Sequence, residues 1–224
     1  MAMLSIDTIV VVPQGAEHQA VCRGLQQANA DIQAIAIPIG TKNVRQILAS
    51  YTQQLSQAQN VLIMGLCGSL TPSYTVGNSV VIQSCWDLNH NCLNLESELM
   101  TIIQNKLSID AVAGLTSDRL IALATEKRQL SQKYPVSIVD MEGYGYISEL
   151  QQRGVTVAML RVVSDDLRRD IPCLSNAIDS AGNLKTVLTA IAFLKQPIAA
   201  VRLIQGSVTG LKALELTTAQ LFTS

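Results

Sequence analysis

The sequence predicts an α/β fold of three layers, in which helices cover both faces of a central, mostly parallel mixed sheet. The first observation is that apolar runs of strand length recur without alternation, as expected for strands buried on both faces; they span 6–12, 32–37, 60–65, 79–83, 136–139 and 155–163. The second is that helical patterns lie between several runs. Over 44–55, apolar residues recur at the spacing that forms a stripe along one side of a helix. Ligands are then expected outside the carboxyl ends of the strands.

Length and composition indicate one domain over 1–224, because 224 residues with 48% hydrophobic and 15% charged residues can bury a sizeable core. After Asp179 the pattern becomes wholly helical, with one helix over 184–194, a break at Pro197 and a second helix from 199 to about 221. We therefore expect 180–224 to form an all-helical C-terminal extension of this domain.

Charge and cysteine usage exclude several classes of protein. A net charge of −1 without long basic runs disfavours binding to nucleic-acid polymers. The start of the chain does not resemble a signal peptide, no apolar run is long enough for a transmembrane helix, and five scattered cysteines suit a reducing compartment, so we expect a cytoplasmic protein. Cys85, His90 and Cys92 lack the paired spacing of zinc ligands, so no metal is expected.

Polar residues or glycines interrupt the apolar pattern after four of the predicted strands. Glu17 follows the first strand, Gly65 and Gly68 bracket a predicted tight turn after 60–65, and Glu142 follows 136–139. Each has a structural interpretation, because an acid stabilises a helix N-terminus and glycines suit turns. Glu142 equally suits a carboxylate that accepts two ligand hydroxyls.

The fourth interruption is Arg161, which lies late in a seven-residue apolar run that ends at Ser164 and Asp165. A buried guanidinium costs several kcal/mol unless it is paired, so a nearby acid or an anionic ligand is expected. The structural alternative is that Ser164 or Asp165 caps the next segment and Arg161 pairs with a structural acid.

Three motifs in this order and spacing, GLCGSL, VDMEGYGYISELQQRGV and VAMLRVVSDD, resemble the nucleoside phosphorylase and nucleosidase superfamily over residues 6 to 166. The resemblance implies that Met141 and Glu142 bind the ribose and that Asp165 protonates the base at nitrogen 7. It further implies that Glu17 activates water and that Arg161, with Gly65 and Gly68, lies near the nucleophile. Dimers or larger homo-oligomers are usual in the superfamily.

The chemistry of N-ribosidic bond cleavage explains these residue types. Positive charge develops on the sugar and negative charge on the departing purine, so carboxylate and acid groups can stabilise both without a metal or organic cofactor. Asp165 would have to hold a proton near neutral pH, which desolvation favours.

Hydrolysis is favoured over phosphorolysis by the positions where phosphorylases of this superfamily carry two arginines and a serine. Here they are Ile63, Leu66 and Glu17, which would not bind a phosphate dianion. Lys42 and Arg161 leave phosphate open as a co-substrate. Leu66 also departs from the serine of many nucleosidases.

The substrate is expected to be an adenine nucleoside with a 5′ substituent. The C-terminal sequence loosely resembles the hopanoid-associated phosphorylase subgroup, which implies an adenosylhopane-type substrate. The apolar residues of the tail would then shelter the hydrocarbon or make a peripheral membrane contact; the structural alternative is that they pack on the sheet or on a second subunit. The alternatives are a methylthioadenosine/S-adenosylhomocysteine-type nucleosidase, a purine nucleoside phosphorylase, and a nucleoside-binding protein with impaired catalysis.

Overall fold

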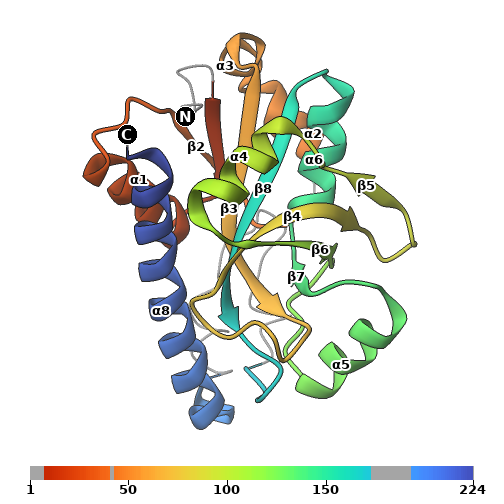
Figure 1. The fold of residues 1–224 in the computed structure, drawn as a ribbon. Helices are drawn as coiled ribbons and strands as arrows, with labels where there is room; N and C mark the ends of the chain where they lie inside the picture. The colour runs from red at the N-terminus through yellow and green to blue at the C-terminus, as the bar shows by residue number, and fades with distance from the viewer. Residues whose placement is uncertain (1–7, 41–42, 173–192, 224) are drawn as a thin grey trace.

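An eight-stranded mixed sheet forms the centre of the molecule (Figure 1). The computed structural model describes residues 8–40, 43–172 and 193–223. The strand order is β2-β1-β3-β7-β6-β4-β5, and β8 pairs with both β3 and β4. The strands are β1 (Thr8–Pro13), β2 (Ala34–Ile37), β3 (Asn60–Ser69), β4 (Ser79–Trp86), β5 (Cys92–Asn94), β6 (Asp110–Thr116), β7 (Ile138–Asp140) and β8 (Thr156–Asp165).

Five strands are hydrogen-bonded in a closed ring. β3 runs parallel to β8 and pairs antiparallel with β7 at its end, β6 runs parallel to both β7 and β4, and β4 returns antiparallel to β8. With β1 also parallel to β2 and β3, the sheet is mostly parallel, as predicted. The ring brings the carboxyl ends of β3, β7 and β8 together.

Three helices cover one face of the sheet: α1 (Ala16–Gln27), α4 (Glu98–Leu107) and α8 (Pro197–Phe222). Their buried residues Ala20, Ile103 and Leu214 pack with residues of the strands such as Leu62 and Leu160. The long helix α8 packs along α1 and against β8 (Figure 1). Its predicted range of 199 to about 221 is confirmed.

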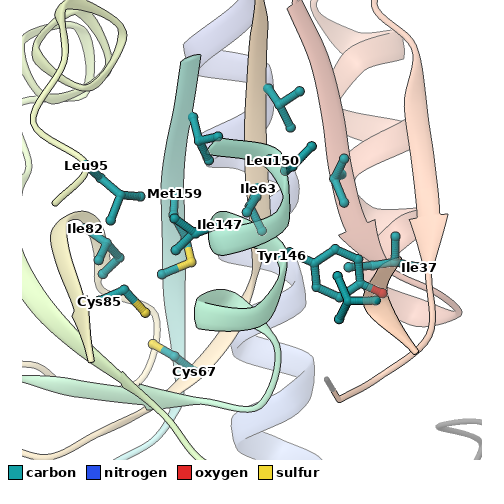
Figure 2. Packing of buried hydrophobic residues seen from close by; sticks show 14 of the residues in the cluster. Ile37, Ile63, Cys67, Ile82, Cys85, Leu95, Tyr146, Ile147, Leu150 and Met159 are labelled. Atoms are coloured by element: carbon teal, nitrogen blue, oxygen red, sulfur yellow. The ribbon is translucent and has the colours of Figure 1, made fainter. Parts of the chain in front are cut away.

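The opposite face is covered by α2 (Val44–Ala49), α3 (Thr52–Gln57) and α6 (Gly143–Gln152). Figure 2 shows Tyr146, Ile147 and Leu150 of α6 among the buried side chains of this face, with Ile63 and Met159 from the sheet. Helices on both faces confirm the predicted three-layer α/β/α arrangement. A further helix, α5 (Ala124–Lys133), lies beside a smaller apolar cluster that contains Leu115, Tyr134 and Val139.

The sequence pattern gave some elements incorrectly. The helix predicted over 44–55 is broken into α2 and α3, because Ser50 and Thr52 bond their side chains to the carbonyls of Ile47 and Ala49 and compete with the helical ladder. The pattern also missed β5, β6, α4 and α5. Most of the helix predicted over 184–194 lies outside the described residues.

Among the described helices, none is both long and apolar enough to cross a membrane.

Candidate active site

One cavity of about 230 Å³ collects most of the predicted site residues. The cavity is lined by Glu17, Gly68, Met141, Glu142 and Asp165. These residues lie at or just after the ends of β1, β3, β7 and β8, and the carboxyl ends of strands are where ligands are expected in such a sheet. Helix α8 closes another side with Leu203 and Ser207. Two larger cavities, of about 660 and 350 Å³, contain none of these predicted residues except Asp165, in the second. Convergence of polar groups therefore locates the site better than volume does.

Gly65 and Gly68 lie within β3, so the predicted tight turn is wrong. In the register of β3 with β8, Gly65 is opposite Arg161 and Gly68 is opposite Asp165. A Cβ atom at Gly65 would lie 2.5 Å from Arg161 Nη1 and 2.7 Å from Glu17 Oε2, and one at Gly68 would lie 2.8 Å from Asp165 Oδ2. The two glycines are needed because these three polar side chains cross the strand where Cβ atoms would otherwise be.

Arg161 has the acidic partner that its burial predicted. Its side chain is fully buried, and Nε and Nη2 donate to Asp140 Oδ2 at 2.9 and 2.5 Å. Thr116 Oγ1 donates to the other oxygen of Asp140 at 2.6 Å, and the backbone N–H of Gly143 at the start of α6 also donates to this carboxylate. Asp140, which was not among the predicted site residues, therefore connects β6, β8 and α6 at the site.

A third donor of Arg161, Nη1, is unpaired in the described part of the chain and lies close to Glu17, which lines the cavity. Nη1 has no hydrogen-bond partner among the described residues, and the Cβ position of Gly65 lies close to both this atom and Glu17 Oε2. A buried unpaired donor is costly and commonly marks a place for water or a ligand atom. Nη1 thus lies where a nucleophile next to Glu17 would receive a hydrogen bond.

The two glutamates at this end of the cavity hold their protons more tightly than exposed acids. Burial raises the pKa of Glu17, whose Oε2 accepts a hydrogen bond from the backbone N–H of Leu66 at 2.6 Å. Burial also raises the pKa of Glu142 to about 8; Arg161 opposes the shift, and the carboxylates of Asp140 and Glu17 add to it. Glu142 is fixed by the backbone N–H of Gly40, 3.2 Å from its Oε1.

The raised pKa of Glu142 predicts a loss of stability with increasing pH. An acid with a folded pKa of about 8, against an ordinary 4.5, contributes stability below its unfolded pKa, and this contribution falls as pH rises through the folded pKa. Glu142→Gln cannot ionise. Between pH 5 and pH 9, the wild type should therefore lose about 4 kcal/mol of unfolding free energy relative to this variant. Urea unfolding across that range measures the difference. Glu96→Gln, at an exposed position, should follow the wild type, whereas parallel curves for Glu142→Gln and wild type would contradict the prediction.

Asp165 is held from both sides at the other end of the cavity. It is buried, and its Oδ1 lies 2.9 Å from the hydroxyl of Ser164. Its Oδ2 accepts a hydrogen bond from the ammonium group of Lys127, a fully buried residue of α5. Lys127 was not predicted, because α5 is a polar segment whose sequence does not distinguish a buried lysine from its exposed neighbours.

Solved structures of nucleosidases share this fold at low sequence identity. Futalosine hydrolase of Helicobacter pylori is 15% identical, with 95% of this chain and 97% of that chain covered and a TM-score of 0.65. The 5′-methylthioadenosine/S-adenosylhomocysteine nucleosidase of Neisseria meningitidis, solved with methylthio-immucillin-A, is 13% identical, with 95% and 99% covered and a TM-score of 0.65. The corresponding H. pylori enzyme is 18% identical, with 94% and 96% covered and a TM-score of 0.62.

These likenesses extend over nearly the whole chain, although no family model and no curated protein sequence matches it. They agree with the three motifs on which the resemblance was based, since those motifs form β3, the β7–α6 junction and β8. The chain therefore has the same fold as these nucleosidases.

Proposed function

We propose that this protein hydrolyses the N-ribosidic bond of a purine nucleoside. The observation that carries the proposal is the single cavity lined by Glu17, Glu142 and Asp165, with the free Nη1 donor of Arg161 beside Glu17. The fold, shared with solved nucleosidases, supports it.

The proposed roles follow from the two ends of the cavity. Met141 packs on the ribose and Glu142 bonds its hydroxyls, close to the positive charge that develops on the sugar. Glu17 takes a proton from water, because a carboxylate with a raised pKa is a better base near neutral pH than an ordinary one. Asp165 directs a proton to the purine, whose nitrogen atoms gain negative charge as the bond breaks. These steps use side chains alone.

Water is the nucleophile rather than phosphate. The carboxylate of Glu17 already accepts the N–H of Leu66 at 2.6 Å, so that a backbone donor that an anion would use is taken by a negative charge. Ile63, at another position where phosphorylases carry a polar residue, is fully buried in the apolar core. Of the two cations that left phosphate open, Arg161 is already paired with Asp140, and Lys42 lies outside the described residues.

The nucleoside carries adenine and a bulky 5′ group, with an adenosylhopane-type hydrocarbon as the extreme case. Helix α8 supports this part of the proposal, because it lines the cavity with Leu203 and exposes apolar side chains nearby on the same helix. Ile198, Val201, Ile204 and Val208 are each about half exposed or more. Such a surface can shelter a hydrocarbon.

The test is to identify the sugar product with and without phosphate. Adenosine, 5′-methylthioadenosine, S-adenosylhomocysteine and a 5′-alkyl adenosine of long chain are each incubated with the protein, and released adenine and sugar are measured by chromatography. Free ribose or its 5′-substituted form, at a rate independent of phosphate, is the expected result. A 1-phosphate product would instead assign a phosphorylase. Nucleoside binding in calorimetry without any base release would leave a binding protein. The rate ratio between short and long 5′ groups decides the substrate class.

A further inference from the structure

Lys127 is a buried cation directly behind the carboxylate of Asp165. It lies in the first turn of α5, none of its side chain is exposed, and its ammonium donates to Asp165 Oδ2 and to the carbonyl of Asp166, the latter at 3.2 Å. Asp165 lines the active-site cavity, whereas Lys127 does not. Removing an ammonium ion from water costs several kcal/mol unless it is paired, so this position requires a specific partner.

The residues around Lys127 and Asp165 leave space for this ion pair. A Cβ atom at Gly68 would lie 2.8 Å from Asp165 Oδ2 and 3.3 Å from Lys127 Nζ, so the glycine leaves space for both charged groups. Helix α5 needs no ion pair to dock, because apolar residues at its C-terminal end, Leu130 and Tyr134, join the adjacent cluster. The burial of Lys127 is therefore better explained by Asp165 than by the packing of α5.

The ion pair raises a question of proton supply that the proposed function leaves open. A carboxylate bonded to an ammonium group is stabilised in its charged form, in which it has no proton to give to a leaving purine. The neighbouring groups do not provide one. Burial raises the pKa of the Cys67 thiol, which therefore retains its proton, and the Asp166 carboxylate accepts the backbone N–H of Arg168 at 2.9 Å. The Ser164 hydroxyl also donates to Asp165, at 2.9 Å, but an alcohol is far too weak an acid to give its proton to a carboxylate. Among the described residues that contact Asp165, the ammonium of Lys127 is therefore the remaining proton source.

We propose that Lys127 supplies the proton that Asp165 passes to the leaving purine, an inference that rests on the proposed nucleosidase function. As the bond between C1′ and N9 breaks, its electron pair goes to the purine. N7 takes a proton from Asp165, and Asp165 takes one from the Lys127 ammonium, which becomes a neutral amine. Water adds to C1′ and gives its proton to Glu17. After product release, solvent removes the proton from Glu17 and restores the one on Lys127 through Asp165.

The experiment compares two leaving groups, because only one of them needs a proton. Adenine released from its nucleoside requires protonation, whereas p-nitrophenolate released from p-nitrophenyl β-D-ribofuranoside leaves as a stable anion. Lys127→Met should lower kcat for adenine release by at least about tenfold, within the range of general acid catalysis, and change kcat for the nitrophenyl riboside by less than about twofold. Lys133→Met, an exposed position of the same helix, is the matched control and should change neither rate.

A double variant separates the loss of proton supply from damage to the fold by an unpaired buried charge. Lys127→Met leaves Asp165 as a buried charge without its counter-ion, whereas Lys127→Met with Asp165→Asn removes both charges. If Lys127 acts through Asp165, the double variant should release adenine no more slowly than Asp165→Asn alone. Equal slowing of both leaving groups, unchanged adenine release in Lys127→Met, or a further tenfold loss in the double variant would each overturn the inference and leave the nucleosidase function standing. A wild type that releases neither leaving group would overturn the proposed function as well.

Discussion

Replacing Asp165 with asparagine is expected to slow purine release by about 10²–10⁴-fold, the contribution that general acid catalysis typically makes. Asparagine has nearly the same size, and its amide oxygen can still accept the hydrogen bond of Lys127, so the cavity should keep its shape. It cannot pass a proton to the purine. The Kd for the nucleoside should change by less than about tenfold, because the loss falls on the transition state. Single-turnover adenine release and calorimetry measure the two quantities.

The adjacent acid provides the control for this variant. The Asp166 side chain is more exposed than that of Asp165 and accepts the backbone N–H of Arg168 at 2.9 Å. Asp166→Asn should therefore retain turnover within about threefold. Normal adenine release by Asp165→Asn would remove this residue from the mechanism, and loss of activity in Asp166→Asn alone would move the role to its neighbour.

Replacing Arg161 with methionine should lower the unfolding free energy by about 3–5 kcal/mol, because it leaves Asp140 as a buried charge without its cation. Arg161 is fully buried, and two of its nitrogen atoms bond one oxygen of Asp140 at 2.9 and 2.5 Å. Asp140 in turn bonds Thr116 of β6 and the N-terminus of α6. The damage should therefore spread to the segment that carries Glu142. Urea unfolding gives the change in free energy.

Two further variants show whether charge causes the loss. Arg161→Met combined with Asp140→Asn removes both charges and should be more stable than Arg161→Met alone. The ion pair between Glu149 of α6 and Arg153, the residue after the helix, lies nearer the surface, so Arg153→Met should cost at most about 1 kcal/mol. A double variant as unstable as Arg161→Met alone would instead assign the loss to packing.

The elements that could be predicted from the sequence are those with a strong local pattern. β3 and β8 are continuous apolar runs because both of their faces are buried, and all six predicted strands are present. β5 is only three residues long and mostly exposed, so it has no such run. α5 is polar over most of its length and contributes few side chains to the core. Local hydrophobic periodicity reports burial, and it fails where an element buries little apolar surface.

The site residues also divide into those that a local motif predicts and those that depend on contacts distant in the chain. Residues that follow a strand within a recognisable motif, such as Glu17, Glu142 and Asp165, were expected at the site, and they line one cavity. Asp140 was visible as an acid in the motif, but its bond to Arg161 joins residues 21 positions apart in the chain. Lys127 and Asp165 are 38 positions apart and belong to no common motif. Whether the two members of such a pair meet depends on which strands and helices are neighbours in the fold.

The sequence by itself therefore determined the layered α/β fold, the strands whose ends carry polar groups, and the acids expected at those strand ends. Only the tertiary structure decided that Gly65 and Gly68 lie in a strand beside Arg161 and Asp165, that Asp140 pairs with Arg161, and that Lys127 contacts Asp165. The physical reason is that burial of apolar surface leaves a periodic trace along the chain. The pairing of buried charges depends on strand order and register, which no local pattern contains.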